Sequence, residues 1–506
     1  MSDVGRGGAV KRGARARPRS AGPTASAAEA IAKISPARAV AFEILTLVGE
    51  GKGHSDELLH SSRTEALSPE DRNLATALAM GVLRWQIALD ARLAKLLARP
   101  DQRLAEPVAL ALRMGAFQLL HLDRIPAHAV LNESVEICRA AGQPHAAGMV
   151  NAVLRKLAAQ PTSQNRDVDK PTSQNRDVGH PVNESPAAFA ERLGHPLWLV
   201  ERWVAAYGRG AALAICEYDQ REPASGGLFV EESAASAEAV PQMDDGSRLV
   251  AELAAVAMPL VAGRAARVWD CCSAPGGKTL VLGLRLDPHL KNETLTPASK
   301  LAGDPEMWGT HGAEILATDV SAKRLAQMVA RLRRYAYAQR VICAVMDASA
   351  AGEALEEQHE AQREWQPEVK FDLILCDVPC SGTGTLARNP EIRHHLRVEE
   401  LTRQADRQRA ILTGALGRLA TGGRLVYSTC SLEPEENEQV VEAAASGAGV
   451  RRISVGPLIA RLAEIDVLKQ DVSAGLIGSA VRDGALRMLP GVHGCDGFFA
   501  VVLERA

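Results

Sequence analysis

The chain of 506 residues carries a formal net charge of -3, with 24% charged and 46% hydrophobic residues. This length exceeds a single hydrophobic core, so we expect two or three domains, and the near-neutral charge argues against a uniformly basic nucleic-acid binder. Nine cysteines without a C-x-x-C pair argue against a zinc site and a disulfide framework, so we expect no metal.

The N-terminal stretch GRGGAVKRGARARPRS is basic, rich in glycine and free of apolar periodicity. These features predict a disordered basic arm over residues 1–34. The arm lacks the apolar run of a signal peptide, and no later segment is long enough to span a membrane. We therefore expect a cytoplasmic protein with no membrane partner.

Residues 35–160 show helical periodicity almost throughout, which predicts an all-α domain. Ser35 is placed to cap the first helix and Pro36 to occupy its first position. The sequence SPED, Ser68 to Asp71, has the spacing of a capping box and predicts a second helix start. Further helices are predicted over residues 88–98, 107–122 and 126–141.

Residues 161–186 are polar and contain the octapeptide PTSQNRDV twice, which predicts a linker. A unit this short and polar cannot bury a face, so we do not expect a structural repeat. Residues 187–250 are expected to form a connector that includes a short helix. Trp198 and Trp203 are its predicted packing anchors.

In residues 251–506, short β-rich runs alternate with helical segments. This alternation is typical of a doubly wound, mostly parallel, Rossmann-like α/β sheet, in which ligands lie at the carboxyl ends of the strands. Residues 498–505 predict a last, antiparallel strand, and residues 287–312 a surface loop. The other predicted strands are residues 266–272, 314–319, 341–347, 371–377 and 423–430.

The stretch CCSAPGGKT, Cys271 to Thr279, directly follows the first predicted strand. Glycines at a strand-to-helix turn let the backbone approach a ligand closely, and a helix start offers free amide hydrogens. The spacing fits neither the dinucleotide fingerprint nor the phosphate-binding P-loop. The loop is a candidate site for a nucleotide-like ligand, with an ordinary glycine turn as the alternative.

Aspartates end or follow three of the predicted strands: Asp319, Asp347 and Asp377. An aspartate after the second strand is well placed to accept hydrogen bonds from ribose hydroxyls. Each of the three could instead cap a helix, because aspartate is a favoured capping residue. Their occurrence at successive strand ends favours a binding cleft.

The stretches DVPCSGTG and YSTCSLEPEEN place Cys380 and Cys430 just beyond two apolar strands. For each thiol, an inert core cysteine is the alternative. Together with CCSAPGGKT, these stretches resemble the motifs of S-adenosylmethionine-dependent RNA 5-methylcytosine methyltransferases. Residues 36–157, with GVLRW, RMGAFQLL and MVNAVLRKLA, resemble the NusB-like domain of the bacterial 16S ribosomal RNA enzymes in that family.

The resemblance implies a cysteine mechanism. Carbon 5 of cytosine is a poor nucleophile until a thiolate adds to carbon 6, and Cys430 is implied to be that nucleophile. Cys380 is implied to assist product release, and Asp377 to contact the base and the cofactor. Lys278 or a helix start near Pro434 could lower the pKa of the thiol. The residues implied to hold S-adenosylmethionine are Cys272, Ser273, Ala274, Pro275, Gly276, Gly277, Lys278, Asp319, Asp347 and Asp377.

The implied substrate is 16S ribosomal RNA with an accessible loop cytosine, because stacking inside a duplex hides carbon 6. We expect phosphate contacts from the arginines of residues 331–340 and 387–397, with an ordinary solvated face as the alternative. His394 and His395 are expected to be exposed or to face RNA. The segment before residue 244 is shorter than in the family, and residues 245–247 could be a remnant of its QD-x-S motif, which leaves the RNA target open.

Two other functions remain open. The first is the same chemistry on transfer RNA, and the second is a catalytically silent RNA-binding or ribosome-assembly module. A DNA cytosine enzyme is disfavoured because that class uses the Pro-Cys thiol, here Cys380, as nucleophile. The presence of both Cys380 and Cys430 argues against a catalytically silent module, since a binding module has no use for two such thiols. We expect a monomer.

Overall fold

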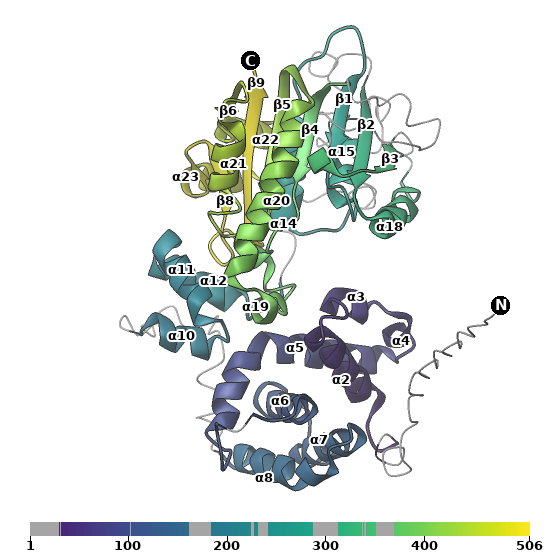
Figure 1. Cartoon of the computed structure of the whole chain (residues 1–506), viewed down its shortest axis with the longest axis vertical. Coiled ribbons are helices and arrows are strands. Elements are labelled where there is room, and N and C mark those ends of the chain that lie inside the picture. The colour runs from purple at the N-terminus through teal and green to yellow at the C-terminus, as the bar shows by residue number, and fades with distance from the viewer. Residues whose placement is uncertain are drawn as a thin grey trace, which may run out of the picture.

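A computed structural model describes residues 30, 32–101, 103–160, 184–223, 227–230, 241–286, 312–335, 337–338, 341–350 and 369–506. Most of the predicted basic arm, linker and surface loop lies outside these residues. Figure 1 shows a helical domain below a domain built on a β-sheet, with a small group of helices beside them. The predicted fold class, an all-α domain followed by a Rossmann-like α/β domain, is confirmed.

The N-terminal domain is a helical bundle whose core combines Ile44, Leu78, Met114 and Leu154 from four different helices. All four side chains are at most 3% exposed, so the apolar stripes that the sequence predicts do meet in one core. The bundle consists of α2 (Pro36–Gly49), α3 (Ser55–Leu59), α4 (Ser62–Glu65), α5 (Pro69–Ala94), α6 (Glu106–His121), α7 (Ala127–Ala140) and α8 (Ala147–Ala158).

Two details of the helical predictions are wrong. Ser35 makes no capping hydrogen bond; its hydroxyl donates to Glu133 Oε2 at 2.7 Å and so joins α2 to α7. The helix predicted over residues 88–98 is mostly the continuation of α5, since no proline follows Pro69 in that run and Gly81 is accommodated where the helix packs against Phe117. The predicted helix start at Ser68 is present, because the Ser68 side chain accepts a hydrogen bond from the Asp71 amide.

Three helices form the connector: α10 (Pro186–Arg192), α11 (Leu197–Tyr207) and α12 (Arg209–Tyr218). Trp203 is 1% exposed and packs in their shared core, and Trp198 packs against that core. The same core includes Leu386 and Leu432 from the domain built on the β-sheet, so the connector is anchored on that domain.

The sheet has the strand order β3-β2-β1-β4-β5-β9-β8-β7, with β6 also paired to β9. The pairs from β3 to β5 are parallel, and β9 pairs with β5 antiparallel, as predicted. The short strands β6 to β8 were not predicted, because runs of two to four residues carry too little pattern. The strands are β1 (Ala266–Asp270), β2 (Ala313–Asp319), β3 (Val341–Val345), β4 (Phe371–Asp377), β5 (Leu419–Thr429), β6 (Val450–Ile453), β7 (Val481–Arg482), β8 (Ala485–Met488) and β9 (Phe498–Arg505).

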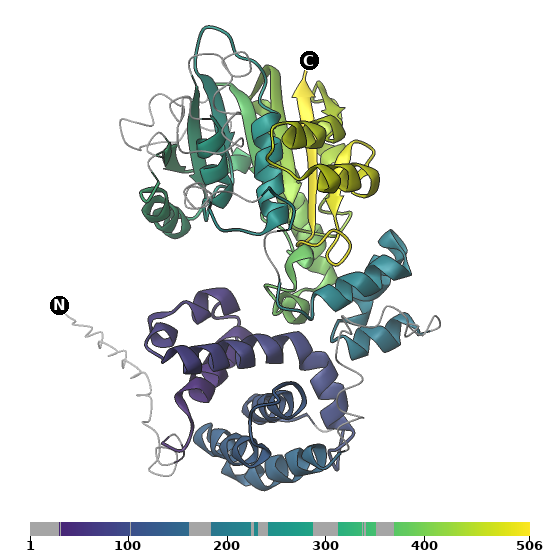
Figure 2. The ribbon, with the colours of Figure 1, turned by 180° about the vertical axis from the view of Figure 1, so that it is seen from behind.

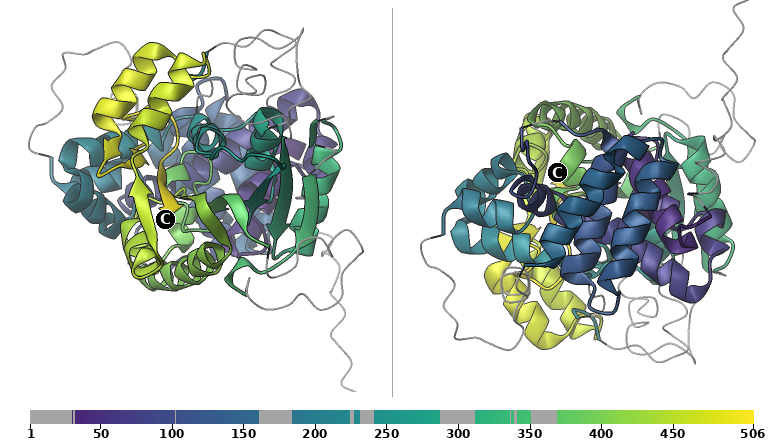
Figure 3. Two further views of the ribbon diagram at one scale, coloured as in Figure 1. Left: turned by 90° about the horizontal axis from the view of Figure 1, so that it is seen from above. Right: turned by 90° about the horizontal axis from the view of Figure 1, so that it is seen from below.

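Helices cover both faces of the sheet, as the views from behind and from above show (Figures 2 and 3). Val268 of β1 packs in the core beneath α14 and α15, whereas its neighbour Trp269 packs beneath α20. Side chains that alternate between two apolar layers explain why these strands read as unbroken hydrophobic runs. The helices are α14 (Asp245–Val256), α15 (Gly277–Leu286), α18 (Ala322–Leu332), α19 (Ile392–His395), α20 (Val398–Gly417), α21 (Glu438–Ala445), α22 (Gly456–Glu464) and α23 (Gln470–Ser479).

The predicted boundary between connector and catalytic domain, at residue 250, falls inside α14, which packs on the sheet. Among the described residues, no helix is long and apolar enough to cross a membrane. No group of three or more His, Cys, Asp or Glu residues that could hold a metal ion occurs in the described part of the chain.

Arg393 lies where the helical domain, the connector and the catalytic domain meet. Its guanidinium is buried and donates to the carbonyl oxygens of Arg84 and Gly194, both at 3.1 Å. His394 Nε2 lies 2.7 Å from the Leu83 carbonyl oxygen, and burial lowers its pKa to about 3. Arg388 donates to Asp496 Oδ2 at 2.8 Å. The expectation that these side chains are exposed or face RNA is therefore wrong for Arg393 and His394, whereas the Arg388 side chain remains 34% exposed.

Candidate active site

A pocket lies at the carboxyl edge of the parallel strands, at the place where the strand order reverses between β1 and β4. The side chains of Asp319, Asp347 and Asp377 line it from β2, from the turn after β3 and from β4. The pocket therefore brings together the three carboxylates that the sequence singles out. Its other lining residues are Cys271, Cys272, Ala274, Val320, Arg324, Met346, Ala348, Val378, Pro379, Arg407 and Ile411.

The glycine loop closes one side of this pocket. The backbone turns sharply at Gly276, where φ is +93° and a Cβ atom would lie 2.7 Å from Met328 Cγ, so only glycine fits. Ser273 is buried and its hydroxyl donates to the Thr318 carbonyl oxygen at 3.0 Å, which ties the loop to β2. Of the loop residues predicted to hold the cofactor, Cys272 and Ala274 line the pocket; Ser273, Pro275, Gly276, Gly277 and Lys278 are not among its lining residues.

The carboxylates of Asp319 and Asp347 differ in their surroundings. Asp319 is 4% exposed and accepts a hydrogen bond from the Ser321 amide at 2.8 Å, so it both lines the pocket and starts the turn into α18. Asp347 is exposed and accepts from the Ser349 amide at 2.9 Å. Asp319 does not cap α18, because Ser321 occupies the N-cap and its side chain accepts from the Arg324 amide, whereas Asp347 accepts at the start of a short 3₁₀ turn.

Cys380 and Cys430 face each other across the loops after β4 and β5. Their sulfur atoms lie 3.4 Å apart, which is hydrogen-bond distance for two thiols and far longer than a disulfide. The contact with Cys430, followed by burial, raises the pKa of the Cys380 thiol well above its ordinary value. Cys380 is therefore held as a thiol beside Cys430.

Lys278 and Asp377 connect the pocket to the thiols. Lys278 Nζ lies 2.8 Å from Asp377 Oδ2, and Ser428 donates to Asp377 Oδ1 at 2.7 Å. Burial opposes the positive charge on Lys278, but the Asp377 carboxylate outweighs it, and Cys430 adds to the same effect, so the pKa of Lys278 is raised.

The predicted helix start near Pro434 is not there. Residues Pro434 to Asn437 form a turn, and α21 begins at Glu438. Lys278 is consequently the cation of the two candidates that the structure places next to the thiols.

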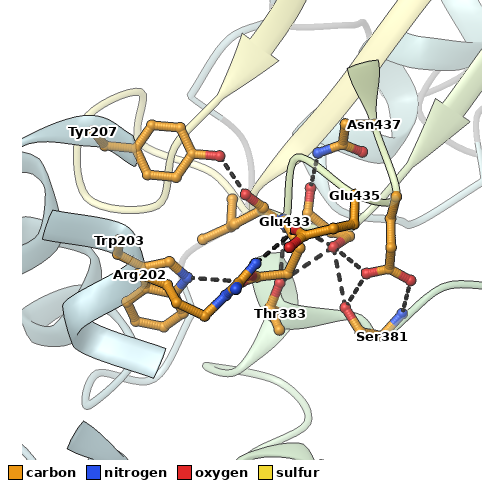
Figure 4. Close-up of polar contacts among 11 residues, drawn as sticks. Arg202, Trp203, Tyr207, Ser381, Thr383, Glu433, Glu435 and Asn437 are labelled. Atoms are coloured by element: carbon orange, nitrogen blue, oxygen red, sulfur yellow. Dashed lines mark hydrogen bonds and ion pairs between the residues drawn. The ribbon is translucent and has the colours of Figure 1, made fainter. Parts of the chain in front are cut away.

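The loop after Cys430 is clamped by α11 of the connector (Figure 4). Arg202 donates to Glu433 at 2.7 Å and to Glu435 at 2.6 Å, and the Trp203 indole donates to Glu433 at 3.1 Å. The Tyr207 hydroxyl donates to the Leu432 carbonyl oxygen. The connector thus holds the loop after Cys430 in place.

Sequence reasoning missed one residue here and left another without a role. Asp270 ends β1, accepts a hydrogen bond from Thr279 at 2.6 Å, and has a pKa that burial raises to about 7. Its position at a strand end was the available signal. Ser247 accepts a hydrogen bond from Lys278 at 2.8 Å, so residues 245–247, the suggested motif remnant, do reach the candidate site.

Family comparisons agree with this architecture. The NusB family matches residues 35–159, and the family described as 16S rRNA methyltransferase RsmB/F matches residues 294–504. A ribosomal RNA small subunit methyltransferase B from Xanthomonas campestris is 31% identical, and the alignment covers 95% of this chain and 99% of the relative. The chain belongs to the 16S rRNA methyltransferase RsmB/F family. The resemblance drawn from the sequence motifs is therefore confirmed at family level.

Two further similarities extend over nearly the whole chain. A probable ribosomal RNA small subunit methyltransferase B from Bacillus subtilis is 29% identical over 94% of this chain and 99% of the relative. The crystal structure of PH0851 has a TM-score of 0.61 at 19% identity and covers 93% of this chain and 99% of that one. The structural similarity supports the fold.

Proposed function

We propose that this protein transfers a methyl group from S-adenosylmethionine to carbon 5 of a cytosine in 16S ribosomal RNA, through a covalent adduct between Cys430 and carbon 6. The observation that carries the proposal is the pair of thiols 3.4 Å apart at the carboxyl edge of the sheet, beside Asp377 and Lys278. Family membership supports methylation of ribosomal RNA, because the relatives are named for it.

The pocket fits the proposed cofactor. Asp319 and Asp347 offer carboxylate oxygens for ribose hydroxyls, and Met346, Val378 and Ile411 offer an apolar surface for an adenine ring. When bound, S-adenosylmethionine supplies an electrophilic methyl group.

In the proposed mechanism Cys430 is the nucleophile. The charge on Lys278 stabilises its thiolate, which adds to carbon 6 and makes carbon 5 electron-rich. The Asp377 carboxylate, fixed by Ser428 and Lys278, accepts a hydrogen bond from the amino group of the cytosine and so orients the base for attack at carbon 6.

Cys380 completes the reaction. Because its raised pKa keeps the Cys380 thiol protonated, Cys380 does not compete with Cys430 as a nucleophile and lies beside the adduct as a neutral thiol. After the proton on carbon 5 is removed, the bond between carbon 6 and the Cys430 sulfur breaks, and a group next to that sulfur is needed to assist release. This division of labour follows from the two thiols having different surroundings.

The direct test is incubation of the protein with labelled S-adenosylmethionine and either 16S ribosomal RNA or transfer RNA, followed by mapping of the methylated base. We expect label on 5-methylcytosine in 16S RNA. Label in transfer RNA alone would replace the proposed substrate, and no label in either RNA would favour a silent ribosome-assembly module.

A further inference from the structure

Glu436 lies behind the two thiols, in the turn that follows the Cys430 loop. Its side chain is completely buried, although it carries no lysine or arginine partner among the described residues. A buried carboxylate without a cation is costly unless its oxygens accept several hydrogen bonds. The position of those donors reveals what the residue holds together.

The donors come from both cysteine loops. Oε1 of Glu436 accepts from the Ser381 amide at 2.8 Å and Oε2 accepts from the Ser381 hydroxyl, and Ser381 is the neighbour of Cys380. Oε2 also accepts from the hydroxyl of Ser431, the neighbour of Cys430. One carboxylate therefore joins the residues that follow the two thiols.

A further donor comes from α20. Gln408 Nε2 donates to Glu436 Oε1 at 2.9 Å and also to the carbonyl oxygen of Pro379 at 3.0 Å. Cys380 is consequently held on both sides, through Pro379 before it and Ser381 after it. The Ser381 and Ser431 hydroxyls lie 3.0 Å apart, which closes the cluster.

We propose that Glu436 is a positioning residue that sets the separation of the two thiols by binding the loop after β4 to the loop after β5. This inference rests on the proposed roles of Cys430 and Cys380. Without the carboxylate, the loops would still be joined by the Gly384 amide donating to the Cys430 carbonyl oxygen and by the Thr383 hydroxyl, which accepts from the Leu432 amide at 2.9 Å. Those contacts align the chains but leave the side chains free to separate.

The test replaces Glu436→Gln in the full-length protein and measures how fast diamide oxidises Cys380 and Cys430 to a disulfide. Diamide takes up the two hydrogens, and mass spectrometry of the linked peptide gives the rate without RNA or cofactor. We expect closure to slow by about tenfold, because small displacements of reacting atoms cost much in rate. If Glu436 acted only through its negative charge, its removal would favour the thiolates and closure would accelerate.

Glu442→Gln is the matched control, since Glu442 lies exposed on α21 and loses the same charge. Its closure rate should equal that of the wild type. An unchanged or faster rate in Glu436→Gln would overturn the inference. If that variant fails to fold, Ser381→Ala combined with Ser431→Ala removes both hydroxyl donors instead, and closure at the wild-type rate there would overturn it.

A second measurement separates this inference from the proposed function. In methyl transfer, Glu436→Gln should lower kcat while the KM for RNA stays within about twofold, because positioning acts on the chemical steps. If the wild-type protein transfers no methyl group, the proposed function fails, whereas the thiol closure rates still report on Glu436.

Discussion

Two buried polar clusters in this protein are built differently. Behind the thiols, both oxygens of Glu436 accept hydrogen bonds, with donors from three segments of the catalytic domain. At the junction of the three parts of the chain, Asp219 Oδ1 and Arg393 Nε are buried without a hydrogen-bond partner among the described residues. In the Glu436 cluster the unpaired buried atom within the described part of the chain is the neutral Gln408 Oε1, whereas at the junction the unpaired atoms belong to a carboxylate and a guanidinium. Unpaired atoms of charged groups raise the cost of burial and make stability respond to pH.

The largest effect is expected at the thiols. Cys430→Ala should reduce methyl transfer by at least about 10³-fold, because it removes the nucleophile. Cys138→Ala is the control, since Cys138 is a buried core thiol of the helical domain. Single-turnover transfer of label to 16S RNA measures both, and full turnover by Cys430→Ala would refute the assigned role.

Cys380→Ala should trap the reaction after the methyl group has moved. The enzyme would form the bond to carbon 6 but release product slowly, so a protein–RNA adduct should survive denaturing gel electrophoresis. The variant that lacks both thiols should give no such band. An adduct in the double variant would mean that another residue attacks the base.

Arg393→Met tests the junction. The substitution removes the guanidinium that donates to the carbonyl oxygens of Gly194 and Asp219 and shares the Arg84 carbonyl oxygen with Gln220, so the free energy of unfolding should fall by about 3 kcal/mol. Urea unfolding measures the change, with the exposed Arg397→Met as control. Equal losses in the two variants would show that the junction contributes no special stability.

Asp219→Asn tests the pH response of the same cluster. Burial raises the pKa of Asp219 from 3.8 to about 7 in the folded state, against the pull of Arg393. The wild type binds this proton more tightly when folded, so its contribution is full below pH 3.8 and is lost as pH rises to about 7. From pH 5 to 8, the wild type should lose on the order of 2–3 kcal/mol relative to the variant. Parallel stability curves for the two proteins would contradict the assigned pKa.

The smallest effects are expected in the pocket at the carboxyl edge of the parallel strands. Asp319→Asn should raise the KM for S-adenosylmethionine by about tenfold, because it removes a buried carboxylate from the strand end. Asp347→Asn should raise it less, since solvent screens an exposed carboxylate. Initial rates at varied cofactor concentration measure both, and the reverse order would place the ribose nearer β3.

Prediction from the sequence succeeded where the signal was local. Glycines, strand-end aspartates and the thiols Cys380 and Cys430 stand out because unusual residues follow apolar strands, and the structure brings these residues to one edge of the sheet. Prediction failed where burial depended on a distant segment. Arg393 was assigned to RNA, yet it lies under Arg84, which is 309 residues away in the chain.

The sequence by itself determined the helical and α/β parts, the parallel strands and the residues able to carry cysteine chemistry, because periodicity and turn residues are properties of neighbouring positions. Only the tertiary structure decided that Cys380 stays protonated, that Lys278 rather than a helix start lies near Cys430, and that Glu436 joins the two loops. These depend on burial and on hydrogen bonds between segments that only folding brings together.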